Sequence, residues 1–147
     1  LFRINFFGVL YSFEAVLPEM LKRGRGHLVG VSSLGAYKGF PGQQGYCASK
    51  AAVKTYLEGL RIQLRYKNIQ VTTICPGFVH TPMTEKHQFN MPFVMDSAEA
   101  ARRVARALRR KKKVFNFPWP TERMVKLMYW VPDRFIAHVL RRTYRDL

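Results

Sequence analysis

The chain has 147 residues, of which 48% are hydrophobic and 14% aromatic, enough for one folded domain with a core. This composition excludes a disordered chain, and two cysteines exclude a disulfide framework and favour a reducing compartment. The formal net charge of +16 predicts an acidic partner, either an anionic lipid, a nucleic acid or a phosphorylated ligand.

The N-terminal part of the chain alternates between helix and strand patterns. Residues 2–23 carry apolar side chains at helical spacing, but charged residues and a proline interrupt the run, so no transmembrane helix is expected. Residues 27–32 form a nearly continuous apolar run, which is typical of a strand buried on both faces. A glycine-rich loop at 34–45 leads into a second long helical pattern over residues 46–67.

The same alternation continues toward the C-terminus. The β-branched residues 69–75 predict a second strand, and irregular residues 78–96 follow it. A third helix begins at Ser97, and a third strand is expected at 114–117. The basic face of this helix, within residues 98–113, has a plain interpretation as solvated surface. Its buried residues are expected to be Ala98, Ala101, Val104, Ala105 and Leu108.

The order of these elements predicts an α/β fold with a doubly wound, Rossmann-like parallel sheet. In such sheets, ligands bind beyond the carboxyl ends of the strands. Ser32-Ser33 follow the first expected strand and Pro76-Gly77 the second, with the stretch 45–50 between them in the chain. We therefore expect these segments to meet at one edge of the sheet.

Tyr46 and Lys50 are four residues apart, so they lie on one face of the expected helix. A free phenol has a pKa of about 10, and a nearby ammonium lowers it, which suits a general acid or base. Ser33 is placed to hydrogen-bond the same substrate oxygen. Most tyrosine–lysine pairs of this spacing are ordinary helix surface, but the convergence with Ser33 and Pro76-Gly77 favours a catalytic role.

At this point the chain resembles the C-terminal half of short-chain dehydrogenases/reductases. The matching pieces are Asn5 in RINFFG, Ser33 in VGVSSLGA, Tyr46 and Lys50 in GYCASK, and PGFVHTPM at 76–83. Their order and spacing match the family, whereas the later elements fit more loosely. The resemblance implies an NAD(P)-dependent oxidoreductase that acts on a carbonyl/alcohol pair.

The family's first strand and glycine-rich, pyrophosphate-binding turn are not found in this sequence. We therefore expect that the N-terminal cofactor-binding half is missing. Residues 1–147 would then be the C-terminal part of a single Rossmann-like domain, with residues 118–147 as an amphipathic helical extension. Such a fragment is expected to be inactive alone.

The resemblance also implies roles for individual residues. Tyr46 would be the acid/base, Lys50 would lower its pKa and hold the nicotinamide ribose, and Ser33 would orient the substrate oxygen. Asn5 would bind the water of a proton relay through a local irregularity in its helix. Residues 82–96 would form a mobile lid. Cofactor contacts would come from Tyr46, Lys50, Pro76, Gly77, Val79 and Thr81. Substrate contacts would come from Ser33, Leu34, Gln43 and Phe78.

Residues 118–147 mix aromatic side chains with arginine and lysine, and two short helices are expected within residues 119–144. This composition suits a helix in a membrane interface and equally a flap over a greasy substrate pocket or a contact with a partner subunit. Each interpretation points to a hydrophobic substrate such as a steroid, a retinoid or a lipid-like molecule. We expect a cytoplasmic protein, with peripheral membrane contact through this segment as the alternative.

The resemblance implies a homodimer or homotetramer, with the helices at 2–23 and 46–67 pairing across the interface. The competing class is a non-catalytic basic binding module for an anionic membrane or a nucleic acid, which the charge of +16 supports. No nucleic acid is expected as a partner, because no helix-turn-helix, zinc-finger or stacking-platform signature is present. The four histidines lack metal-ligand spacing, so no metal is expected. The choice between NAD and NADP and the substrate's identity stay open.

Overall fold

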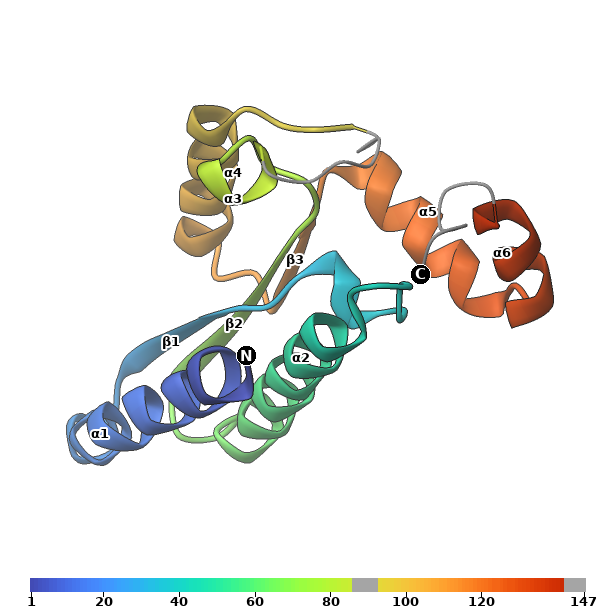
Figure 1. Ribbon diagram of the computed structural model, residues 1–147. Coiled ribbons are helices and arrows are strands. Elements are labelled where there is room, and N and C mark those ends of the chain that lie inside the picture. Colours follow the sequence, from blue (N-terminus) through green and yellow to red (C-terminus); the bar gives the residue numbers. More distant parts are fainter. Residues whose placement is uncertain (86–92, 142–147) are drawn as a thin grey trace.

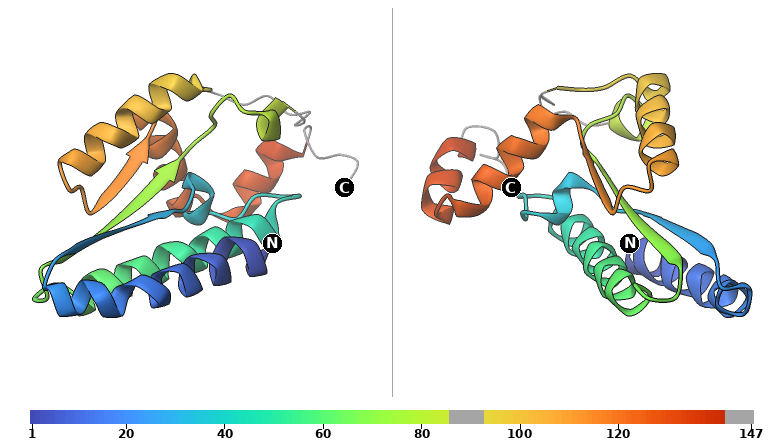
Figure 2. Two further views of the ribbon diagram at one scale, coloured as in Figure 1. Left: turned by 90° about the vertical axis from the view of Figure 1, so that its left-hand side faces the viewer. Right: turned by 180° about the vertical axis from the view of Figure 1, so that it is seen from behind.

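The structure is a computed structural model, and it describes residues 1–85 and 93–141 (Figure 1). Three parallel strands form its sheet in the order β1 (Gly26–Val31), β2 (Ile69–Pro76) and β3 (Val114–Phe117). Figure 2 shows helices on both faces of this sheet. The predicted doubly wound parallel sheet is therefore confirmed. The central strand β2 is buried almost throughout, whereas β1 lies at the edge and is buried only at alternate positions near its end.

One face of the sheet is covered by α1 (Gly8–Arg23) and α2 (Gln44–Gln63), which lie side by side (Figure 2, left). Apolar residues recur along α2 at positions three and four apart, and they point toward the sheet. Gly30 of β1 lies directly beneath Leu57 of α2, since a Cβ on Gly30 would stand 2.5 Å from Leu57 Cδ1. The buried cluster on this face comprises Phe13, Leu28, Val53, Leu57, Leu60, Leu64, Ile69 and Val71.

The other face of the sheet is covered by α4 (Ser97–Arg109). Asp96 caps this helix, because its side chain accepts a hydrogen bond of 3.1 Å from the Glu99 N–H. Ala100 packs with Ile74 and Phe117 in the core on this side. The set of α4 residues that was expected to be buried was partly wrong, because Ala98 and Ala101 are exposed whereas Ala100 and Ala107 are buried. Val104 and Leu108 pack against the core as expected.

Several boundaries differ from those expected from the sequence. The first helical segment begins with a π-helix, η1 (Arg3–Phe7), which continues into α1. The glycine-rich loop contains a short 3-10 helix, η2 (Leu34–Ala36), and α2 begins two residues earlier than the pattern indicated. The expected irregular stretch contains a one-turn helix, α3 (Pro82–Glu85), while residues 86–92 lie outside the described part.

Two C-terminal helices, α5 (Trp119–Trp130) and α6 (Asp133–Leu140), extend away from the sheet (Figure 1). Val125 of α5 anchors them through a buried cluster with Leu34 and Cys75. A polar chain reinforces this contact: the Tyr37 hydroxyl donates to Asn116 Oδ1 at 3.2 Å, and Asn116 Nδ2 donates to Glu122 Oε1 at 2.8 Å. The predicted pair of short helices is thus present, and residues 142–147 lie outside the described part.

The segment Arg3–Arg23 is long and apolar enough to cross a membrane by length and composition, with a mean hydropathy of 1.2. The sequence pattern had not predicted such a helix. Only 6% of its most apolar window is buried in the structure. Core helices of soluble proteins and N-terminal signal sequences satisfy the same length and composition.

Candidate active site

The carboxyl ends of β1 and β2 bring Ser33 and Pro76 together, as parallel pairing predicts. Ser33 is the N-cap of η2, and its Oγ accepts a hydrogen bond of 3.0 Å from the Gly35 N–H. The same Oγ lies 3.5 Å from the carbonyl oxygen of Pro76, the last residue of β2. Gly77, the next residue, packs against Leu34, since a Cβ on Gly77 would stand 3.2 Å from Leu34 Cδ1. Ser33 therefore lies directly above the Pro76-Gly77 turn.

Tyr46 approaches Ser33 from the first turns of α2. A Cβ built on Gly35 would stand 3.4 Å from Ser33 Oγ and 3.6 Å from Tyr46 Cε1. The serine hydroxyl and the tyrosine ring therefore border the same point in space. Cys47 Sγ lies 3.5 Å from that point, and Cys47 is buried. Glycine at position 35 leaves room between the two polar side chains.

Lys50 lies one turn after Tyr46, and its Nζ is 5.9 Å from the centre of the tyrosine ring. Nζ donates a hydrogen bond of 3.2 Å to the carbonyl oxygen of Val31, at the end of β1. The Ser32 hydroxyl donates to the Lys50 carbonyl oxygen at 2.7 Å, which fixes this turn of α2 against the strand. Burial lowers the pKa of the Lys50 ammonium, and Cys75 opposes that shift.

Asn5 lies in the π-helix η1, where the extra residue in the turn changes the direction of the side chains. Its Nδ2 donates a hydrogen bond of 3.0 Å to Ser49 Oγ. Ser49 Oγ in turn donates to the Tyr46 carbonyl oxygen at 2.7 Å, and Ser49 is fully buried. Asn5 is thereby connected to the helix turn that carries Tyr46. Sequence reasoning missed Ser49, although a small polar residue three positions after Tyr46 on the inner helix face was the available signal.

Val79 and Thr81 lie in the loop after β2, and Thr84 ties this loop together. The Thr84 hydroxyl donates to the Val79 carbonyl oxygen at 2.8 Å and accepts from the Thr81 N–H at 2.9 Å. Val79 packs on the α4 side of the sheet, in the cluster that includes Ile74. The loop thus begins at the carboxyl end of the sheet, as the segment with Ser33 does, and the Val79 side chain packs on the face that α4 covers. Sequence reasoning missed Thr84, whose signal was the threonine pair three residues apart at 81–84.

The residues expected to contact substrate have different surroundings. Leu34 is buried against Cys75 and Val125, so its side chain supports the loop from inside. Gln43 is the N-cap residue of α2, without a capping hydrogen bond from its side chain. Phe78 is half-buried in the loop after β2. Part of the expected lid, residues 86–92, lies outside the described part of the chain.

A groove of about 370 Å³ runs beside the candidate site, between the start of the first helix and β1. Asn5, Val31 and Lys50 are among the residues that line it. The Lys50 ammonium has three N–H donors and uses one for the hydrogen bond to the Val31 carbonyl oxygen, so two N–H donors remain for a ligand. This donor set fits the hydroxyl groups of a ribose. Within residues 1–85 and 93–141, no group of three or more His, Cys, Asp or Glu side chains is placed to hold a metal.

The helices on both faces of the parallel sheet, with Ser33, Tyr46 and Lys50 near its carboxyl end, define a doubly wound α/β protein with a candidate acid/base site. The model of the short chain dehydrogenase family matches residues 1–91. An uncharacterized oxidoreductase of Myxococcus xanthus is 42% identical over 138 residues, which cover 94% of this chain and 54% of that protein. The chain belongs to the short-chain dehydrogenase family.

Other relatives agree with this membership. Dehydrogenase/reductase SDR family member 7B of Rattus norvegicus is 38% identical over 81 residues, which cover 55% of this chain and 25% of that protein. A short chain dehydrogenase from Burkholderia cenocepacia, solved in complex with NADP, superposes with a TM-score of 0.77 at 24% identity and covers 94% of this chain and 57% of its own. At this identity the solved structure shows the fold alone. The chain spans about half the length of the first curated relatives it matches.

Proposed function

We propose that the protein is an NAD(P)-dependent oxidoreductase that transfers a hydride between nicotinamide and a carbonyl/alcohol substrate, with Tyr46 as the acid/base. One observation carries this proposal: Ser33 Oγ and the Tyr46 ring border the same point beside Gly35. Lys50 lies one turn along the helix from Tyr46. Membership of the short-chain dehydrogenase family supports this function over a non-catalytic basic binding module.

The bound nicotinamide would supply or accept the hydride at the substrate carbon. In the reductive direction, the Tyr46 hydroxyl donates its proton to the substrate oxygen, and in the oxidative direction it takes that proton back. Ser33 Oγ accepts a hydrogen bond from Gly35 and donates its proton to the Pro76 carbonyl oxygen over a long 3.5 Å, and in this proposal the proton turns from Pro76 to the substrate oxygen. The two hydroxyl groups then hold one oxygen between them.

Lys50 and Asn5 support Tyr46 in this proposal. The Lys50 ammonium beside the ring stabilises the negative charge that develops when Tyr46 gives up its proton. Its remaining donors would hold the ribose hydroxyls of the cofactor. Asn5 Nδ2 donates a hydrogen bond to Ser49 Oγ, so Asn5 Oδ1 remains as an acceptor for a relay water. Pro76 and Gly77, with Val79 and Thr81 beyond them, would line the nicotinamide site.

The test is Tyr46→Phe in the full-length protein, which removes the transferable proton and keeps the ring. Turnover should fall by at least about 100-fold, the range typical for the loss of a general acid or base. Cofactor affinity, followed by nicotinamide fluorescence, should change little. Tyr66→Phe is the matched control, because Tyr66 is 87% exposed beyond the end of α2. Undiminished turnover of the Tyr46→Phe enzyme would refute the acid/base assignment.

We also propose that the protein is a homodimer or homotetramer that pairs through α1 and α2. Large apolar side chains, among them Ile4 and Tyr11 at the start of the first helix and Ile62 on α2, are exposed in the single chain. A surface of this kind is typical of a contact between subunits. Sedimentation equilibrium measures the assembly, and a monomer at all concentrations would contradict it.

A second candidate function is peripheral contact with an anionic membrane through α5 and α6. Exposed aromatic residues and cations share these helices: Trp119, Arg123, Lys126, Tyr129, Trp130, Arg134 and Phe135. Such a surface would also bring the enzyme to a hydrophobic substrate of the steroid, retinoid or lipid type. Co-sedimentation with phosphatidylserine vesicles tests the contact, and Trp130→Ala should weaken it. No association with such vesicles would remove this candidate.

A further inference from the structure

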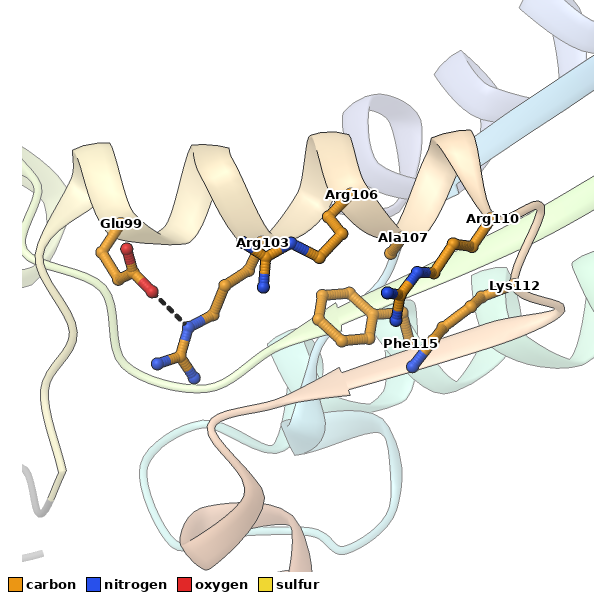
Figure 3. Close-up of a pocket in the computed structure, with 7 residues that line it drawn as sticks. All are labelled: Glu99, Arg103, Arg106, Ala107, Arg110, Lys112 and Phe115. Carbon is orange, nitrogen blue, oxygen red and sulfur yellow. Dashed lines mark hydrogen bonds and ion pairs between the residues drawn. The ribbon is translucent and has the colours of Figure 1, made fainter.

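A second cavity lies on the opposite side of the sheet from α2, between α4 and β3 (Figure 3). Its volume is about 290 Å³. The side chains that line it include Glu99, Arg103, Arg106, Arg110, Lys112 and Phe115. None of these residues belongs to the candidate active site, so the proposed oxidoreductase function leaves this cavity unexplained.

The cavity carries an excess of positive charge. Arg103 and Arg106 come from α4, Arg110 is the C-cap residue of that helix, and Lys112 lies in the connection before β3. The carboxylate of Glu99 is bound by Arg103 at 2.7 Å and by the neighbouring Arg102 at 3.0 Å. Within the described ranges 1–85 and 93–141, no ion pair neutralises Arg106, Arg110 or Lys112. Three cations therefore share one small space without an ion-pair partner among the described residues, since the Glu99 carboxylate is engaged by Arg102 and Arg103.

The strand side of the cavity is apolar. Phe115 of β3 lies next to Lys112, whose Nζ is 5.2 Å from the centre of the ring. The ring also stacks on Phe117 at 5.1 Å between centres, which holds it in place. Figure 3 shows the Arg106 and Arg110 side chains extending from the helix side of the cavity toward the level of this ring, whereas Arg103 points toward Glu99. Cations beside a partly buried apolar surface attract an anion more strongly than cations fully surrounded by water.

We propose that this cavity binds a phosphate-bearing ligand, through a phosphomonoester or diphosphate group held by Arg106, Arg110 and Lys112. Arginine presents paired N–H donors that match two oxygens of one phosphate group, and lysine adds a point charge. The volume is at the lower end of small-molecule sites, which suits a diphosphate-sized group. The ligand would be a soluble phosphate compound or the headgroup of an anionic lipid, since both offer the same chemistry.

The test uses inorganic pyrophosphate as the probe, titrated by calorimetry into the protein at constant ionic strength. Arg106→Gln/Arg110→Gln removes two charges that line the cavity. Arg109→Gln/Lys113→Gln is the matched control, because it removes two charges from the same region that do not line it. We expect the first pair to weaken binding by about 30-fold or more, as expected for two charge-assisted hydrogen bonds. The control should weaken it by less than about threefold, through screened long-range attraction alone.

The source of the phosphate is separated by a vesicle arm. Phosphatidylcholine vesicles with and without phosphatidic acid are sedimented with the wild type and both double variants. A loss of vesicle binding confined to the Arg106→Gln/Arg110→Gln variant assigns the site to a lipid headgroup, whereas pyrophosphate binding without such a loss assigns it to a soluble phosphate. Equal losses of pyrophosphate affinity in the two double variants, or no saturable binding to the wild type, would overturn the proposal. Thermal melting verifies that all variants fold, and the outcome is independent of Tyr46.

Discussion

Gly30 and Leu57 offer a direct test of how closely α2 packs on the sheet. In Gly30→Ala, the new Cβ would stand 2.5 Å from Leu57 Cδ1 and 2.9 Å from Leu57 Cδ2. Leu57 is fully buried and is surrounded by the core of this face, so it has little room to move. Overpacking of this kind costs about 1 to 3 kcal/mol of unfolding free energy.

The partner variant Leu57→Ala removes the side chain that causes the clash. Alone it should cost about 2 to 5 kcal/mol, because it leaves a cavity under α2. In the double variant the methyl group introduced by Gly30→Ala enters that cavity, so the two losses should not add. We expect the double variant to be about 1 to 2 kcal/mol more stable than additivity predicts, since the two residues are in contact. Gly59→Ala serves as the control: a Cβ there meets nothing within 4 Å, and helix propensity should stabilise the protein by about 0.5 to 1 kcal/mol.

Urea unfolding measures the wild type and the four variants, and equal m-values show that the midpoints report stability. Additive losses to within about 0.5 kcal/mol would refute the close approach of α2 to β1. A stable Gly30→Ala protein would refute it as well. The outcome bears on the active site, because α2 carries Tyr46 and Lys50, and a shift of this helix moves both.

Two further predictions concern the carboxyl end of the sheet. Asn116→Ala removes the hydrogen bonds to Tyr37 and Glu122 and should lower the free energy of unfolding by about 2 kcal/mol. An unchanged urea midpoint would show that this series of hydrogen bonds does not anchor α5. Burial raises the pKa of the Cys75 thiol from 9.0 to about 11, so the folded state keeps a proton that the unfolded state has lost in this range. This contribution to the free energy of unfolding is complete below pH 9 and is lost as the pH rises toward 11, by up to about 2 to 3 kcal/mol. Cys75→Ala should therefore make the free energy of unfolding fall less steeply between pH 9 and 11. Equal slopes of the free energy of unfolding against pH in the two proteins would contradict the raised pKa.

The parts of the fold that follow from local spacing were predictable from the sequence. Apolar residues at helical spacing identified α2, and β-branched residues identified β2. The prediction that the ends of β1 and β2 meet depended only on parallel pairing, and the contact between Ser33 and Pro76 follows from it. The roles assigned to these residues remain predictions.

Other features depend on tertiary contacts that no single segment encodes. Alanines are so frequent in α4 that two adjacent stripes both look apolar, and only packing on the sheet selects Ala100 over Ala101. Leu34 is buried because Val125 of α5 packs against it, although Val125 lies 91 positions further along the chain (125 − 34). The role of Ser49 as a link between Asn5 and Tyr46 requires the side-by-side arrangement of the first helix and α2.

The parallel order of the sheet has a consequence for how the chain reaches its native state. Gly26 pairs with Ile69 and Thr73 with Val114, so each strand pairing must close a loop of about forty residues before it forms. The three described strands include no hairpin, in which neighbouring strands pair early. Helices α1 and α2 are local in sequence, so we expect them to form first and the sheet to assemble around them slowly. During synthesis, strand residues such as Val71 and Ile74 remain exposed for that interval, and slower translation at low temperature should raise the yield of folded protein.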